Sequence, residues 1–118
     1  MSPLTPRSYV AVFIEGDQRP VFLMSIDLKT RELTIRPISA GRLSDKSYEL
    51  WIVSDDISLR SLGLLDAAAR PTRKWLEGFD RDALRKATFG ISAEPKGGSP
   101  VGRPTGPAKH GKLVPATN

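Results

Sequence analysis

The feature that most constrains the fold is a series of short segments rich in alternating apolar residues, separated by turn residues. Segments of this length and period are typical of β-strands. No helical pattern follows strand after strand, so a parallel βαβ architecture is not expected. The sequence therefore predicts an all-β fold, an antiparallel β-sandwich (immunoglobulin-like or related) or an open barrel. The expected strands number about seven and cover residues 8–15, 21–28, 32–38, 48–54, 58–65, 88–94 and 108–114.

Alternation within these segments predicts which side chains are buried. The segments 21–28 and 32–38 each carry one apolar face, and the short link between them predicts an antiparallel hairpin. The segment 8–15 is apolar on both faces, which predicts a strand that is covered on both sides or paired centrally. The candidate core residues are Phe22, Ile35, Trp51 and Phe89.

One short helix is predicted at residues 80–87. Asp80 can cap its N-terminus, and Arg85 and Lys86 lie in its last turn, where basic residues complement the helix dipole. The preceding residues, 66–79, show no clear period and are predicted to be irregular. Within them, Trp75 is expected to roof one end of the sandwich, and contact with a partner is the alternative.

Charge and composition argue against several classes of function. The net charge is +5, and residues 96–118 hold four basic residues and no acidic one, so the rest of the chain is nearly neutral. A basic stripe interleaved with aromatic residues is absent, and we expect no nucleic-acid partner. With no Cys and only His110, the chain lacks the ligands of a zinc site and a clear nucleophile–base pair. We expect no catalytic, cofactor-binding or metal-binding residues and no enzymatic activity.

The stretch "EPKGGSPVGRPTGP" at residues 94–107 departs from the strand pattern. It is not a phosphate-binding loop, because no helix follows it and its prolines lack the N–H groups that bind phosphate. Its glycines and prolines suit an ordered crossover between the two sheets, and a disordered tail is an equal alternative on composition alone. The candidate structural or interaction residues are Gly97, Gly98, Ser99, Pro100, Thr105, Gly106 and Pro107.

Several motifs in one order resemble the C-terminal, extracytoplasmic domain of RskA-type anti-sigma-K factors. The similarity covers about residues 8–113 and is weaker over 66–87, where Trp75 and charged residues replace an alanine- and leucine-rich segment. The motifs are "YELW" at 48–51, "SLG" at 61–63, "GISAEP" at 90–95, "GGSP" at 97–100 and "TGP" at 105–107.

The resemblance implies a longer protein with two parts that this sequence lacks. These are an N-terminal cytoplasmic domain that binds a sigma factor and a single transmembrane helix. Residues 1–7 would then be a juxtamembrane linker or an added start, 8–113 a single β-sandwich domain, and 114–118 a frayed C-terminus. The sequence has no signal peptide and no apolar run of the ~20 residues that cross a bilayer. The domain would lie on the extracytoplasmic (periplasmic) face of the bacterial inner or plasma membrane.

The resemblance also implies a function. The domain would be a non-catalytic sensory and regulatory unit that gates a first cut by a site-1 protease and so controls release of the sigma factor. The stretch 94–107 would be a stiff crossover that leads to the last edge strand. The alternative is an independent extracellular β-sandwich module that binds a glycan or a protein.

Overall fold

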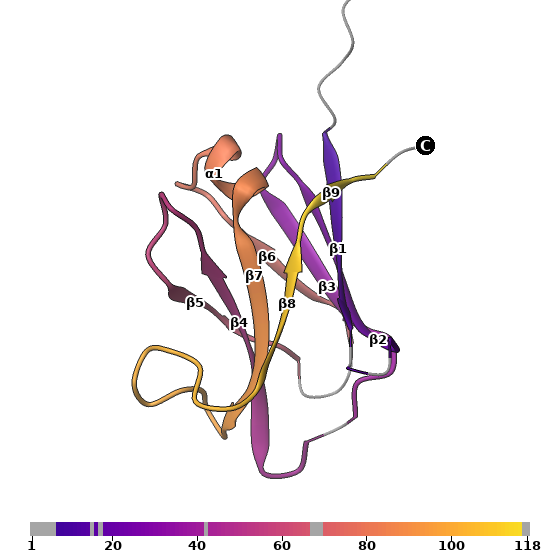
Figure 1. Cartoon of the computed structure of the whole chain (residues 1–118), viewed down its shortest axis with the longest axis vertical. Coiled ribbons are helices and arrows are strands. Elements are labelled where there is room, and N and C mark those ends of the chain that lie inside the picture. The colour runs from indigo at the N-terminus through magenta and orange to yellow at the C-terminus, as the bar shows by residue number, and fades with distance from the viewer. Residues whose placement is uncertain (1–6, 15, 17, 42, 67–69, 117–118) are drawn as a thin grey trace, which may run out of the picture.

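The computed structural model describes residues 7–14, 16, 18–41, 43–66 and 70–116. These residues form one short helix and a series of antiparallel strands (Figure 1). The elements are β1 (Ser8–Ile14), β2 (Pro20–Asp27), β3 (Glu32–Pro37), β4 (Lys46–Val53), β5 (Arg60–Leu64), β6 (Thr72–Trp75), α1 (Arg81–Lys86), β7 (Thr88–Pro95), β8 (Ala108–Lys112) and β9 (Val114–Pro115).

The strands form two sheets, so the predicted all-β sandwich is confirmed. One sheet has the order β6-β3-β2-β1-β9 and the other the order β5-β4-β7-β8. The expected hairpin of β2 and β3 is present, with Met24 opposite Ile35. The two strands that the sequence does not predict, β6 and β9, are short and lie at the two edges of the first sheet.

The main core lies between the inner faces of the two sheets. Phe22, Ile35 and Phe89 belong to it. Trp51 is also buried, but it lies outside this core, because it alternates along β4 with the core residues Leu50 and Ile52. Trp51 therefore belongs to the outer face of the four-stranded sheet.

Strand β1 lies between β2 and the short edge strand β9, and only one of its faces is covered. It pairs with β2 along its length and with β9 at Tyr9 and Val10. Tyr9, Ala11 and Phe13 are buried, whereas Val12 and Ile14 on the other face are more than 40% exposed. The predicted cover on both faces is therefore not found, and pairing on both sides is found only at Tyr9 and Val10.

The C-terminal residues differ from the prediction of a frayed end. Val114 and Pro115 form β9, and the N–H of Ala116 donates a hydrogen bond of 2.9 Å to the carbonyl of Ser8. Residues 117–118 lie outside the described residues. The chain thus changes sheets between β8 and β9, at the buried Leu113, and the two ends of the described domain meet.

One end of the sandwich is closed by α1 and the residues before it (Figure 1). The predicted helix is present, and the side chain of its N-cap, Asp80, accepts a hydrogen bond of 3.1 Å from the N–H of Ala83. Leu76 and Leu84 are buried beneath this end. The role predicted for Trp75 is wrong: it is 56% exposed on β6, and Leu76 next to it enters the core instead. No helix among the described residues could span a membrane.

Lys74 on the edge strand β6 points toward the interior. It lies opposite the buried Leu33, and its ammonium comes so close to Gly63 on β5 that a Cβ there would lie 2.7 Å from it. No carboxylate among the described residues pairs with Lys74, and burial lowers its pKa. An inward-pointing charge on an edge strand discourages pairing with the edge of another molecule.

We expect Lys74→Met to raise the free energy of unfolding and to promote self-association, because it removes a desolvated charge from an edge. In the wild type, stability should increase as the pH rises toward the ordinary lysine pKa of 10.5. The reason is that the unfolded chain still holds the proton of the Lys74 ammonium at pH values where the folded chain has begun to lose it. Urea denaturation at several pH values and light scattering test both effects, with the exposed Lys86→Met as control. A less stable Lys74→Met would contradict this account.

Candidate functional site

The Gly- and Pro-rich loop, defined as residues 96–107, lies at the end of the sandwich opposite α1 (Figure 1). It joins β7 to β8, which are antiparallel neighbours in the four-stranded sheet. The predicted crossover between sheets is therefore wrong, because the chain remains within one sheet. The loop does lead to an edge strand, since β8 is the last strand of that sheet.

The first half of the loop is held by hydrogen bonds to β4 and β7. The N–H of Gly97 donates to the hydroxyl of Ser47 at 3.2 Å, and the N–H of Gly98 donates to the carbonyl of Pro95 at 2.8 Å. Gly97 and Gly98 have φ values of 94° and 110°, which residues with a side chain rarely adopt. The hydroxyl of Ser99 donates to the carbonyl of Arg103 at 2.5 Å and closes the turn. These contacts favour the ordered alternative over a disordered tail.

A buried carboxylate, that of Glu49 on β4, anchors this half of the loop. Its two oxygens accept hydrogen bonds from the N–H of Ser99 at 2.8 Å and from the hydroxyl of Ser61 at 2.5 Å. Glu49 is 7% exposed, although it occupies the outer face of the sheet, which usually faces water. Glu49 thus ties the loop to β4 and, through Ser61, to β5.

A second buried carboxylate, that of Glu94 on β7, anchors the other half. Glu94 is fully buried. It accepts hydrogen bonds from both the N–H and the hydroxyl of Thr105, from the N–H of Gly106 at 3.3 Å and from the hydroxyl of Ser92 at 2.5 Å. Burial by itself raises the pKa of Glu94, but the hydrogen bonds from Ser92, Thr105 and Gly106 outweigh it and lower the pKa. The carboxylate is therefore ionised at neutral pH.

Trp51 completes this polar cluster. Its indole N–H donates to the hydroxyl of Ser92 at 2.9 Å, and that hydroxyl donates in turn to Glu94. Trp51 lies opposite Gly90 in the register of β4 and β7, and a Cβ at Gly90 would lie in contact with the side chain of His110 on β8. The outer face of the four-stranded sheet thus carries a second buried layer, built from Glu49, Trp51, Ser92 and Glu94.

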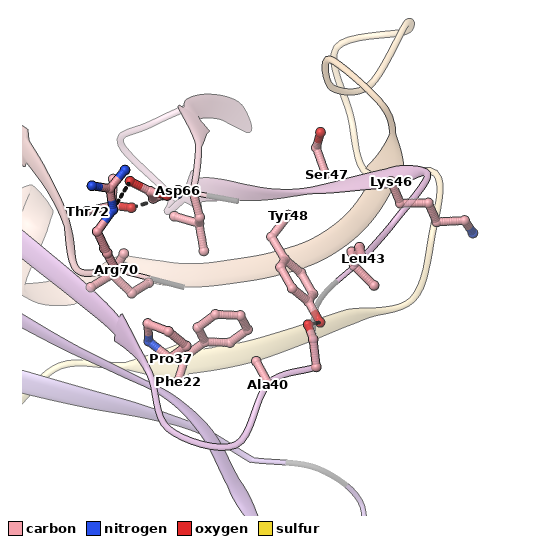
Figure 2. Close-up of a pocket in the computed structure, with 13 residues that line it drawn as sticks. Phe22, Pro37, Ala40, Leu43, Lys46, Ser47, Tyr48, Asp66, Arg70 and Thr72 are labelled. Carbon is pink, nitrogen blue, oxygen red and sulfur yellow. Dashed lines mark hydrogen bonds and ion pairs between the residues drawn. The ribbon is translucent and has the colours of Figure 1, made fainter. Parts of the chain in front are cut away.

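A narrow hollow opens between the two sheets at the same end of the molecule (Figure 2). Phe22 and Tyr48 meet edge to face in its wall, with ring centroids 5.0 Å apart. The Tyr48 hydroxyl donates to the carbonyl of Gly41 at 3.0 Å. The centre of a water molecule can occupy only about 40 Å³ of this hollow. It is therefore a slot and not a wide cavity.

Polar side chains surround the mouth of this slot. Arg70 lies 3.5 Å from the carboxylate of Asp66, and the hydroxyl of Thr72 accepts a hydrogen bond of 2.8 Å from the N–H of Asp66. On the other side of the mouth Lys46 extends into solvent (Figure 2). No acidic side chain among the described residues pairs with Lys46.

The structure brings some of the predicted site residues together and separates others. Gly97, Gly98, Ser99, Thr105 and Gly106 all belong to the loop that the two glutamates hold. Pro100 and Pro107, which are exposed, are part of the same loop. Trp51 lies in the buried layer beneath that face of the sheet, and Phe22 and Ile35 line the slot. Phe89 lies in the core and reaches neither feature.

Sequence reasoning misses Glu49 and Glu94, the two residues that organise the site. The alternation of each strand places them on the side away from the core, where a charged residue is ordinarily solvated. One signal was available: Trp51 shares that side of β4 with Glu49, and a large aromatic residue there indicates that something covers the sheet. The carboxylate oxygens are already engaged by the loop, which suits a structural role and leaves little capacity for acid–base chemistry.

One comparison with known proteins gives a match. The model of the family described as the C-terminal region of the anti-sigma-K factor RskA matches residues 2–108. The matched range includes both carboxylate anchors and the whole loop. No curated protein and no solved structure matches the chain.

Proposed function

Because the chain belongs to the family of RskA anti-sigma-K factor C-terminal domains, we propose that it is the extracytoplasmic part of a membrane-anchored anti-sigma factor. The family is one of anti-sigma regulatory domains, and its partner is a sigma factor. In our proposal the sigma factor binds an N-terminal domain on the cytoplasmic side. The β-sandwich has no catalytic activity and limits a first proteolytic cut outside the membrane.

The observation that supports this proposal is the way the start of β1 is enclosed. Strand β1 is hydrogen-bonded to β2 on one side and to β9 on the other. Just before it, the carbonyl of Arg7 accepts a hydrogen bond of 2.9 Å from the N–H of Leu28, and the Arg7 guanidinium lies 2.7 Å from the carboxylate of Asp27. A protease needs an extended, detached substrate, so a cut close to Arg7 requires this region to open.

The short strand β9 is the weakest element of the enclosure. It pairs with β1 at only two positions, Tyr9–Pro115 and Val10–Val114, and Val114 is 53% exposed. Detachment of β9 uncovers one edge of β1 at its start and costs little buried area. A signal that favours the detached state raises the cleavage rate, by no more than its difference in affinity for the two states.

Removing β9 tests directly whether its pairing with β1 limits proteolysis at the start of β1. We compare a chain that ends at Leu113 with a control that ends at Ala116, and measure the initial rate of tryptic cleavage after Arg7 by mass spectrometry. Losing β9 is expected to speed that cut about tenfold, which corresponds to about 1.4 kcal/mol of local stability. Cleavage after Lys86 in the same digest reports general unfolding.

Equal rates of cleavage after Arg7 in the two chains would contradict the proposal that β9 limits proteolysis at the start of β1. So would a parallel increase after Lys86, because the deletion would then act by unfolding the whole domain.

A further inference from the structure

We propose that the outer face of the five-stranded sheet, at its β6 edge, binds a neutral glycan of β-1,4-linked sugars. The residues that form this glycan surface are Trp75 and Arg73 on β6 and Glu32 on β3. The inference does not depend on the proposed limit on proteolysis, because it concerns a ligand of the folded domain itself.

Trp75 is the residue that makes this face unusual. Tryptophan side chains are highly buried on average, and Trp51 is 2% exposed, yet Trp75 is 56% exposed. Trp75 lies on the outer face because it follows the inward-pointing Lys74 on β6. An exposed indole offers an apolar ring and one N–H donor. The C–H face of a sugar ring packs on such a surface.

Two charged side chains flank Trp75. Glu32 lies directly opposite Trp75 in the register of β3 and β6, and Arg73 comes two residues before Trp75 on the same face. Among the described residues, no basic side chain forms an ion pair with Glu32 and no acidic one with Arg73. Glu32 and Arg73 occupy neighbouring rows of the sheet without forming an ion pair with each other. Neither charge is therefore neutralised by a neighbour, and both can bind a ligand.

This combination of groups fits a sugar better than a protein or an anionic polymer. A carboxylate accepts hydrogen bonds and a guanidinium donates them, whereas a hydroxyl does both. The hydroxyls of one sugar can therefore satisfy Glu32 and Arg73 while its C–H face covers Trp75. A protein partner would have to bury both charges in the centre of an interface, where charged residues are depleted. A negatively charged polymer would be repelled by Glu32.

The shape of the surface favours an extended chain of sugars. The outward-facing residues of β3 continue the site from Glu32 to Thr34 and Arg36. Alternate residues of a strand lie about 7 Å apart, so these polar groups extend over more than one sugar unit. β-1,4-linked sugars form flat ribbons that can lie on the face of a sheet. Residues 30–36 and 72–76, which carry the site, are described without a gap.

NMR titration of the ¹⁵N-labelled protein with cellohexaose and chitohexaose tests the proposal. The two indole N–H signals are separate reporters, because Trp75 is exposed and Trp51 is buried. At least one of the two hexaoses is expected to shift the Trp75 indole signal and the amide signals of Glu32, Thr34 and Arg73 in a saturable way, while the Trp51 indole signal stays in place. Maltohexaose, whose α-1,4 linkages coil the chain, should bind more weakly by about fivefold or more.

Three variants separate the contributions to binding. Trp75→Ala should weaken binding by about tenfold or more, as expected for an aromatic hot spot. Glu32→Gln keeps the shape of the side chain but loses its charge, and should weaken binding about threefold. Val12→Ala is the control, because it trims an exposed residue on the same face of the sheet, two strands away from β3, and should change nothing. The Trp51 indole signal, which depends on the hydrogen bond to Ser92, shows whether each variant is folded.

Three results would overturn the proposal. They are the absence of a saturable shift of the Trp75 indole signal with either β-linked hexaose, shifts confined to the exposed apolar residues Val12 and Ile14, and an unchanged affinity of Trp75→Ala. The titration contains no protease, so its failure leaves the proposed limit on proteolysis untouched. The tryptic comparison contains no sugar, so a failure there leaves the glycan surface untouched.

Discussion

Replacing Glu94 with alanine is expected to lower the free energy of unfolding by about 3 kcal/mol or more. The substitution removes the acceptor for the hydroxyl of Ser92, the N–H and hydroxyl of Thr105 and the N–H of Gly106. Hydrogen bonds to a charged group contribute more than neutral ones, and Ser92 becomes a buried donor without its partner. Urea denaturation followed by tryptophan fluorescence measures the change, because Trp51 is linked to Glu94 through Ser92.

Two comparisons sharpen the test of Glu94. Glu77→Ala removes an exposed carboxylate and should change stability by less than about 0.5 kcal/mol. Glu94→Gln keeps the shape of the side chain but loses the charge, so it should still cost stability at neutral pH. A variant at position 94 that is as stable as the wild type would show that the loop does not depend on this carboxylate.

The pH dependence of the Glu94 effect has a definite sign. The pKa of Glu94 is lower in the folded protein than the ordinary value of 4.5, so folding favours the ionised form. Its contribution is fully present above the unfolded-state pKa and is lost as the pH falls through the folded-state pKa. The gap in stability between the wild type and Glu94→Gln should therefore be constant near neutral pH and shrink below about pH 4.5.

Gly106→Ala is expected to cost about 3 kcal/mol or to release the second half of the loop. A Cβ at this position would overlap the carbonyl oxygen of Ala93, and a backbone atom within a paired strand cannot move aside. The φ value of Gly106 is not positive, so the penalty is steric and not conformational. The loss should appear both in urea denaturation and as faster hydrogen exchange of the Thr105 amide.

Gly16→Ala is the matched control, because a Cβ at Gly16 meets no atom within 4 Å and its φ value is not positive. That substitution should leave stability within about 0.5 kcal/mol of the wild type. If Gly106→Ala lowered the free energy of unfolding as little as Gly16→Ala, the loop could not be packed closely on β7 at this position.

The parts of the fold that the sequence predicts are those in which one face of an element is buried against the other sheet. In β2 and β3 the buried face leaves a regular alternation, and in α1 the cap at Asp80 marks the start. The missed strands lack that signal. β6 has four residues with a lysine turned inward, and β9 has two residues, which is too few for any period.

The site is harder to predict than the fold because it depends on a loop folding back onto a sheet. The sequence around Glu94 does not distinguish it from a solvated glutamate, since its donors Thr105 and Gly106 lie 11 and 12 residues further along the chain, in the second half of the loop. The glycine and proline motifs of the loop are evident in the sequence, but the contacts that require them are not. Gly98 and Gly106 are needed because the backbone approaches Glu49 and Ala93 closely, which only the tertiary structure reveals.

The pairing of β1 with β9 has a consequence for a chain that a ribosome produces from its N-terminus. Strand β1 is the first to be made, yet its second neighbour consists of residues 114–115, which are synthesised about a hundred residues later. Until then one side of β1 is bare at its start, however well the other strands have assembled. The start of β1 in the nascent domain therefore stays open to proteases until residues 114–115 have been made.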